Sequence, residues 1–210
     1  MIKAAFFDVD DTLINTKSMV DFFLFVRGIL IEEQKSTRFL EQLKAMQASG
    51  KDRASLNRHY FRAFKGVNAA SLSSYGYRWF LVKAQQDRFF KQEVITKLNE
   101  LATHNYKIVL VSGSFLPILA PIAKALNCHD ILCTEPQVIA GELTGELIGQ
   151  PCIGVTKKDR IHRFSLLNDI DLRQSWAYGD DDTDASMLES VGNSVWVDND
   201  CSRVIANASR

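Results

Sequence analysis

Apolar residues follow two different patterns along the chain. Short, nearly continuous apolar runs are typical of strands in a parallel sheet covered on both faces, whereas apolar residues at every third or fourth position indicate amphipathic helices. The predicted strands are residues 2–7, 107–112, 130–134, 175–179 and 194–198. The predicted helices between them cover residues 94–101, 116–126 and 161–167. Strands that alternate with helices predict an α/β fold with a doubly wound, Rossmann-like parallel sheet.

The long segment after the first predicted strand follows only the helical pattern. Between residues 16 and 88, apolar side chains recur at helical spacing, and polar stretches such as ASGKDR divide the pattern into several helices. We therefore predict an α/β core made of residues 1–15 and 89–210, with an all-helical cap subdomain, residues 16–88, inserted into it. The aromatic residues of the cap are expected to form its interior. The stretch VIAGELTGEL, residues 138–147, predicts a small β-hairpin beside the sheet.

The overall charge argues against nucleic acid and anionic membranes as partners. Lys and Arg together number 25, as do Asp and Glu, so no bulk positive charge would hold a polyanion. The N-terminus lacks the pattern of a signal peptide, and no apolar stretch approaches the roughly 20 residues that span a bilayer. The four cysteines contain no CxxC pair and are expected to be reduced. These features predict a cytoplasmic globular protein and leave its oligomeric state open.

Three acids stand close together where the first predicted strand ends. Asp8, Asp10 and Asp11 lie within DVDDT, and carboxylates this close repel one another unless a metal ion, a reaction or exposure to solvent compensates. A carboxylate such as Asp8 can attack a phosphoryl group and form an aspartyl-phosphate. A second carboxyl, Asp10, can protonate the leaving oxygen and then activate water, while Mg²⁺ would neutralise the charge. Asp11 has no evident chemical task and is expected to be an exposed loop acid.

Polar residues also mark the ends of other predicted strands. In an open parallel sheet, ligands bind beyond the carboxyl ends of the strands, so these residues are expected to share one crevice. In VSGSFLP, the Ser112 hydroxyl and the Gly113 N–H can bind phosphate at the start of a helix, and Ser114 is expected to cap that helix. In GVTKKDR, either Lys157 or Lys158 can neutralise phosphate.

Four acids crowd a further strand-to-helix turn within YGDDDTDASML. A bound cation would explain why so many acids lie so close together. Asp180, at the strand end, is the best candidate for a second carboxylate ligand of the metal. Asp184 can be a ligand through water or can hold the lysine. Asp182 is expected to cap the helix that follows.

These four motifs, in this order, resemble the haloacid dehalogenase superfamily, and most closely its phosphoserine-phosphatase-like branch, which carries a helical cap. DVDDT matches the DxDxT signature, VSGS the hydroxyl motif, the lysine segment the third motif and GDDDTD the acidic fourth motif. The resemblance implies Asp8 as the nucleophile and Asp10 as the general acid and base, with Thr12 and Asp184 in supporting roles.

The same resemblance implies how phosphate and metal are bound. Ser112, Gly113 and a lysine would bind the phosphoryl group, and the spacing from Gly154 resembles the branch better with Lys157 than with Lys158. Mg²⁺ would be held by the Asp8 carboxylate, the Asp10 backbone carbonyl and Asp180.

One position departs from that branch. Phosphoserine phosphatases usually place a glutamate nine residues after the nucleophile, where it meets the substrate's amino group, but Lys17 stands here. Because a lysine would repel an ammonium group, we expect a substrate other than phosphoserine, with another anionic or a neutral polar group, unless Lys17 simply points into solvent.

The expected function is therefore that of a Mg²⁺-dependent phosphatase, a hydrolase of phosphate monoesters that acts on a small phosphorylated metabolite. Two alternatives remain open at this point. A phosphotransferase would pass the same aspartyl-phosphate to an alcohol, and a non-catalytic module would only bind a metal ion or a phosphorylated ligand.

Overall fold

A six-stranded sheet forms the centre of the protein. The computed structural model describes residues 1–198 and the backbone of residues 204–208. The strands follow the order β3-β2-β1-β6-β7-β8, and every neighbouring pair is parallel except β7 and β8. They are β1 (Ala4–Phe7), β2 (Lys107–Ser112), β3 (Asp130–Cys133), β6 (Trp176–Gly179), β7 (Asn193–Val197) and β8 (Val204–Ala208). The doubly wound parallel sheet predicted from the sequence is confirmed, with β8 as an additional antiparallel edge strand.

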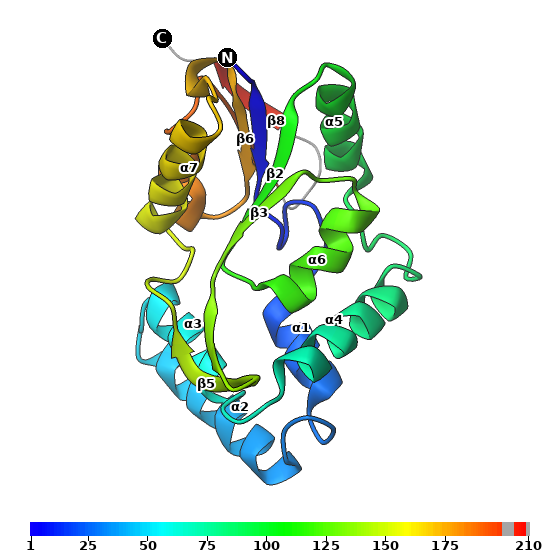
Figure 1. Ribbon diagram of the computed structural model, residues 1–210, viewed down its shortest axis with the longest axis vertical. Coiled ribbons are helices and arrows are strands. Elements are labelled where there is room, and N and C mark those ends of the chain that lie inside the picture. The colour runs from blue at the N-terminus through cyan, green and yellow to red at the C-terminus, as the bar shows by residue number, and fades with distance from the viewer. Residues whose placement is uncertain (199–203, 209–210) are drawn as a thin grey trace.

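Helices cover both faces of this sheet. They are α5 (Gln92–Thr103), α6 (Leu116–Ala125), α7 (Val155–Leu167) and α8 (Ala185–Leu188), with 3-10 turns at Leu172–Gln174 and Asp182–Asp184. In Figure 1, α5 and α6 lie on one side of the strands and α7 on the other. Because successive residues of a strand point to opposite faces, β1 sends Phe7 into the apolar cluster of α5 and α6 and Phe6 into that of α7. Within the described part of the chain, no helix has both the length and the apolar character needed to cross a membrane.

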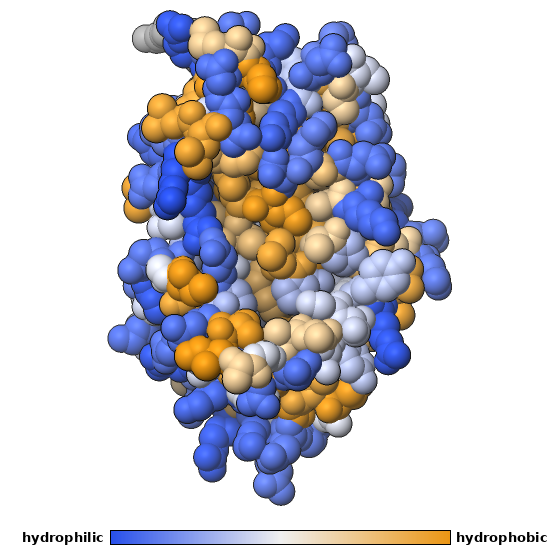
Figure 2. All heavy atoms as spheres, viewed as in Figure 1, coloured by the Kyte–Doolittle hydropathy of each residue, from blue (hydrophilic) through white to orange (hydrophobic). Residues whose placement is uncertain are grey.

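Four further helices separate β1 from α5 along the chain. They are α1 (Ser18–Val26), α2 (Glu33–Ala48), α3 (Arg53–Arg62) and α4 (Ala69–Lys83), called here the inserted helices. They lie beyond the carboxyl ends of the strands, below the sheet in Figure 1. Their interior is aromatic, as expected: Phe22 packs against Phe64 and Trp79, with ring centroids 6.4 and 6.2 Å away. Figure 2 shows that hydrophilic residues cover their outer end, at the bottom of the view.

A small antiparallel hairpin joins the core to the inserted helices. Its strands are β4 (Pro136–Ile139) and β5 (Glu142–Leu147), so the hairpin predicted from the sequence is confirmed. The N–H of Gly66 donates to the Leu143 carbonyl at 2.8 Å, and the N–H of Leu143 donates to the Val67 carbonyl at 2.9 Å. The hairpin therefore pairs with the chain between α3 and α4.

A glycine and two prolines create a close contact between α4 and α6. Pro121 lies inside α6 and has no N–H, so the carbonyl of Pro117, four residues earlier, receives no helical hydrogen bond from it. Gly76 of α4 faces this carbonyl so closely that a Cβ at residue 76 would lie 1.9 Å from the Pro117 oxygen. The absence of a side chain at Gly76 lets α4 pack directly against the backbone of α6, which fixes the last inserted helix to the core.

The substitution Gly76→Ala tests this contact. In an unconstrained helix, glycine to alanine stabilises by roughly 0.5–1 kcal/mol, but here the methyl group must push α4 away from α6. We expect the free energy of unfolding to fall by about 1–3 kcal/mol, measured by urea unfolding. Ser74→Ala, at an exposed position of the same helix, is the control and should change stability by less than about 0.5 kcal/mol. A more stable Gly76→Ala protein would contradict the contact.

Candidate active site

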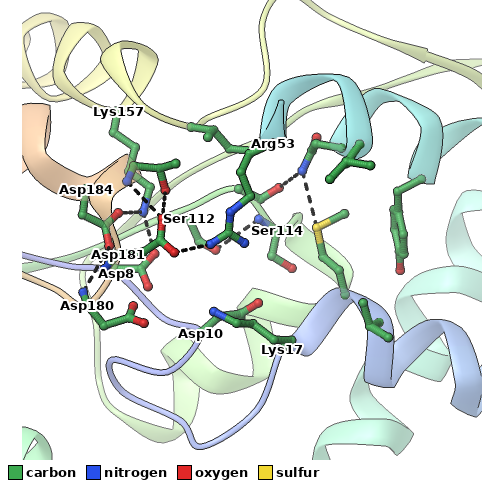
Figure 3. Close-up of a pocket in the computed structure, with 18 of the residues that line it drawn as sticks. Asp8, Asp10, Lys17, Arg53, Ser112, Ser114, Lys157, Asp180, Asp181 and Asp184 are labelled. Atoms are coloured by element: carbon green, nitrogen blue, oxygen red, sulfur yellow. Dashed lines mark hydrogen bonds and ion pairs between the residues drawn. The ribbon is translucent and has the colours of Figure 1, made fainter. Parts of the chain in front are cut away.

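A cavity of about 290 Å³ opens where the carboxyl ends of three neighbouring strands meet the inserted helices. Asp8 directly follows β1, Ser112 ends β2 and Asp180 follows β6. Because β2, β1 and β6 are neighbours in the sheet, these side chains line one cavity although they are far apart in sequence (Figure 3). The structure thus brings together the polar strand ends that were expected in one crevice.

A buried lysine bridges two of the acids. Lys157 lies in the first turn of α7, and its Nζ is 2.5 Å from Asp8 Oδ1 and 2.6 Å from Asp184 Oδ1. Burial lowers the pKa of Lys157, but the two carboxylates outweigh burial and raise it above its ordinary value. Burial raises the pKa of Asp8, an effect that Lys157 opposes and Asp184 reinforces. Of the two candidate lysines, Lys157 is the one that reaches the acids, while Lys158 is only partly buried.

Three carboxylates gather around one point. One oxygen from each of Asp8, Asp180 and Asp184 lies within 4.8 Å of the others. Thr12 Oγ1 donates to Asp180 Oδ1 at 3.0 Å, so the DVDDT segment also orients the second strand-end acid. Carboxylate oxygens are the ligands that Mg²⁺ prefers in proteins. This donor set therefore fits a hard divalent cation.

The turn after β6 is wound around Asp184. Asp184 Oδ2 accepts hydrogen bonds from the N–H groups of the two residues that follow β6, at 3.2 and 3.3 Å. A Cβ on Gly179 would lie 2.6 Å from the Asp184 Cβ, so this approach requires a glycine. The turn is capped by Asp181, which accepts from the N–H of Thr183 at 3.0 Å. The prediction that Asp182 caps this turn is wrong by one residue, because Asp182 already lies inside the turn.

Asp10 keeps one oxygen free within the cavity. Its Oδ2 accepts a hydrogen bond from the N–H of Ser18 at 3.0 Å, at the start of α1, where the helix dipole favours a carboxylate. Its Oδ1 is buried and has no hydrogen-bond partner among the described residues. Burial raises the pKa of Asp10 to about 6, against the opposing effect of Ser18. A carboxyl with a free oxygen and such a pKa can give up and take up a proton near neutral pH.

The loop after β2 presents a hydroxyl group to the cavity. Ser112 Oγ accepts a hydrogen bond from the N–H of Ser114 at 3.1 Å, which leaves its own hydrogen for another acceptor. The carbonyl of Gly113 accepts from Asn57 Nδ2 at 2.8 Å, so α3 holds this peptide in place. Ser114 does not cap α6 as expected, because the N-cap residue is Phe115.

Two cations at the rim of the cavity are paired with acids. Lys17 Nζ lies 2.7 Å from Asp11 Oδ2, and Arg53 reaches Asp181 Oδ2 at 2.5 Å. Figure 3 shows Arg53 extending across the cavity toward Asp181, and Lys17 beside Asp10. Asp11, expected to be an exposed loop acid, instead has a side chain only 24% exposed and is the partner of Lys17. It lies outside the group of three carboxylates.

The inserted helices supply lining residues that sequence reasoning missed. Arg53, Asn57 and Tyr60 of α3 all line the cavity. The helical spacing of Tyr60 predicts a place in the aromatic interior, and Arg53 and Asn57 belong to no motif. No local sequence signal separates these three residues from others on the same helix.

Comparisons with curated proteins agree with the sequence motifs. A family model described as haloacid dehalogenase-like hydrolase matches residues 5–189. A probable phosphatase of Mycobacterium tuberculosis is 28% identical over 94% of this chain and 69% of its own length. Phosphoserine phosphatase SerB1 of the same organism is 26% identical over 95% of this chain and 66% of its own length. The chain thus spans about two thirds of the length of these relatives.

Solved structures share the fold. A Bordetella pertussis protein of unknown function superposes with a TM-score of 0.80 at 19% identity, covering 93% of this chain and 90% of that one. A substrate-bound phosphoserine phosphatase superposes with a TM-score of 0.65 at 20% identity, covering 93% of this chain and 86% of that one.

The buried lysine predicts a stability effect that depends on pH. Lys157→Met removes the cation between Asp8 and Asp184 and should lower the free energy of unfolding by about 3–5 kcal/mol at pH 8 without added metal. The loss should be smaller at pH 5, because burial raises the pKa of Asp8 to about 8, so that this carboxyl is protonated at the lower pH and no longer needs the cation.

Urea unfolding at the two pH values measures this effect. Lys158→Met, on the same turn of α7, is the matched control and should change stability by less than about 0.5 kcal/mol. Equal losses for the two variants would show that Lys157 does not compensate the buried acids.

Proposed function

This chain belongs to the haloacid dehalogenase-like hydrolase family, and on that basis we propose that it hydrolyses the phosphate monoester of a small metabolite through an aspartyl-phosphate at Asp8. One observation carries the proposal. The Asp8 carboxylate lies in the same cavity as the free Oδ1 of Asp10 and the Nζ of Lys157. This common cavity supports the roles of nucleophile for Asp8, proton carrier for Asp10 and phosphate-binding cation for Lys157.

The first half of the reaction transfers the phosphoryl group to the protein. Lys157 holds Asp8 Oδ1, so Oδ2 is the oxygen that attacks phosphorus, and the ester P–O bond breaks as the new bond forms. The Oδ1 of Asp10 delivers a proton to the departing alkoxide, which leaves as the alcohol. The Ser112 hydroxyl, the Gly113 N–H and the Lys157 ammonium group bind the phosphoryl oxygens and stabilise the charge that develops on them.

The second half regenerates Asp8. Asp10, now ionised, removes a proton from a water molecule, and the resulting hydroxide attacks phosphorus while the bond to Asp8 Oδ2 breaks. Inorganic phosphate leaves. The same carboxyl therefore serves as acid and then as base, which suits a group whose pKa burial raises to about 6.

The acidic cluster would hold the cation that this reaction needs. Asp8, Asp180 and Asp184 offer three carboxylate oxygens close together, and the family resemblance adds the backbone carbonyl of Asp10. Bound Mg²⁺ would supply positive charge that brings the anionic nucleophile and the phosphate together. Asp184 also holds Lys157, so it supports the site whether it binds the cation directly or through water.

The inserted helices would act as the cap of this active site. We propose the division of the chain into a catalytic core, residues 1–15 and 89–210, and a cap, residues 16–88, which covers the cavity and excludes water during phosphoryl transfer. Residues of α3 line the same cavity as the acids, which supports this role. We also propose a reducing cytoplasmic location, supported by the free thiols of Cys128, Cys133 and Cys152.

The nucleophile is tested by Asp8→Asn, which keeps the shape of the side chain and removes its charge. With Mg²⁺ and p-nitrophenyl phosphate, we expect kcat to fall by about 10³-fold or more. Asp11→Asn is the matched control, since Asp11 has φ +59° and asparagine tolerates that backbone conformation; its activity should stay close to that of the wild type. Undiminished turnover by Asp8→Asn would rule out the covalent route.

Product analysis in the same assay separates hydrolysis from transfer. In the presence of candidate acceptor alcohols, a phosphatase releases only inorganic phosphate, whereas a phosphotransferase forms a new phosphate ester. Formation of the ester would show that the protein is a phosphotransferase and not a phosphatase. The proposed role of Asp8 would be unchanged.

Metal dependence is tested by chelation and by one ligand variant. EDTA should abolish turnover of p-nitrophenyl phosphate, and added Mg²⁺ should restore it. Asp180→Asn should raise the Mg²⁺ concentration for half-maximal activity by about tenfold or more, because it removes one charged ligand. Asp182→Asn changes an exposed acid of the same turn and should leave the Mg²⁺ dependence unaltered. Full activity in EDTA would refute the assignment of a metal site.

A further inference from the structure

Two buried polar atoms of residues that line the cavity have no hydrogen-bond partner among the described residues and no task in the proposed reaction. They are the hydroxyl group of Tyr60 and the Oδ1 of Asn57. Both side chains line the cavity, and only 3% of Tyr60 and 6% of Asn57 is exposed. A buried polar atom without a hydrogen bond is unfavourable by about 1–3 kcal/mol. These two atoms therefore indicate a ligand group that forms a hydrogen bond with each of them.

The positions of both atoms are fixed by their surroundings. Asn57 and Tyr60 stand three residues apart on α3, which places them on the same side of the helix. The ring of Tyr60 packs among Phe64 and Phe115, with centroids 5.1 and 6.1 Å away. The Nδ2 of Asn57 donates to the carbonyl of Gly113 at 2.8 Å, so its Oδ1 is turned away from that peptide. Neither group can therefore swing round to another protein partner without losing these contacts.

The chemistry of the two atoms is neutral and complementary. The Asn57 Oδ1 can only accept a hydrogen bond, whereas the Tyr60 hydroxyl can donate one. Burial and the nearby Asp10 raise the pKa of Tyr60 well above its ordinary value, so the phenol stays uncharged. A hydroxyl group, which donates once and accepts as well, is the simplest group that satisfies both atoms.

The charged groups around this part of the cavity already have partners. Lys17 is paired with Asp11, and Arg53 is paired with Asp181. The remaining lining residues on this side are largely apolar, among them Met19, Leu43 and Leu56. Within each pair the two charges cancel, so this side of the cavity offers no net charge to a carboxylate or an ammonium group on the substrate.

We propose that the substrate is the phosphate ester of a small uncharged alcohol that carries a further hydroxyl group, bound between Asn57 Oδ1 and the Tyr60 hydroxyl. This inference rests on the proposed phosphatase function and names the class of compound that the same site accepts. The apolar residues contact the carbon skeleton, and the cavity of about 290 Å³ limits it to a small molecule. Phosphoserine, which carries both a carboxylate and an ammonium group, is a poor match.

A matched series of phosphate esters tests the proposal. Glycerol 1-phosphate carries uncharged hydroxyl groups, 1-propyl phosphate lacks them, and 3-phosphoglycerate and phosphoserine carry additional charges on a similar skeleton. With the full chain and Mg²⁺, we expect kcat/KM to be highest for glycerol 1-phosphate, by about tenfold over 1-propyl phosphate. Tyr60→Phe should reduce kcat/KM for glycerol 1-phosphate about tenfold more than for 1-propyl phosphate.

Controls separate recognition from folding. The melting temperature of Tyr60→Phe should equal or exceed that of the wild type, because the lost hydroxyl has no hydrogen-bond partner in the part of the chain that the structure describes. Tyr77→Phe, at an exposed position of α4, should alter neither selectivity nor melting temperature. A wild-type preference for phosphoserine or 3-phosphoglycerate, an equal loss on both neutral esters in Tyr60→Phe, or a lower melting temperature of this variant would overturn the inference.

The same experiment distinguishes failure of the proposed substrate class from failure of the proposed phosphatase function. If p-nitrophenyl phosphate is hydrolysed but glycerol 1-phosphate shows no advantage, the substrate class is wrong and the phosphatase function stands. If no phosphate ester is hydrolysed, the proposed function fails and the substrate class fails with it.

Discussion

The contact of Lys157 with Asp8 and Asp184 is the interaction on which the site depends. It joins the end of β1, the first turn of α7 and the turn after β6, three segments that are distant in sequence. Without this cation, burial of the two carboxylates would be strongly unfavourable. With it, the acids stay close together, as the proposed cation site and the proposed nucleophile both require. The lysine therefore makes an otherwise repulsive cluster compatible with a folded protein.

Much of this arrangement could be predicted from the sequence, because it follows from general rules about sheets. The strand at residues 107–112 is found with its predicted bounds, and the edge rule for parallel sheets correctly groups Asp8, Ser112 and Asp180. Helix geometry alone does not predict whether Lys157 or Lys158 is buried, since neighbouring residues of a helix point about 100° apart and packing decides between them. Both predicted helix caps are wrong by one residue, because the N-cap residues are Phe115 and Asp181, not Ser114 and Asp182.

The residues of α3 that line the cavity could not be identified from the sequence, for a different reason. On α3, a helical pattern assigns Tyr60 to the interior, and this is correct for its ring, which is buried among other aromatic residues. The pattern carries no information about the hydroxyl group, which has no hydrogen-bond partner among the residues that the structure describes. The arrangement of the acids thus follows from motifs and topology, whereas the proposed selectivity rests on how the inserted helices pack over the cavity.

The proposed covalent mechanism is tested most directly by identifying the residue that is phosphorylated during turnover. The protein would be mixed with p-nitrophenyl phosphate and Mg²⁺, quenched in acid within the first turnovers, digested and examined by mass spectrometry for a phosphorylated peptide. We expect a phosphoryl group on Asp8, present during turnover and absent when the substrate is exhausted. A phosphoryl group on another residue, or turnover without a phosphorylated protein at any quench time, would contradict it.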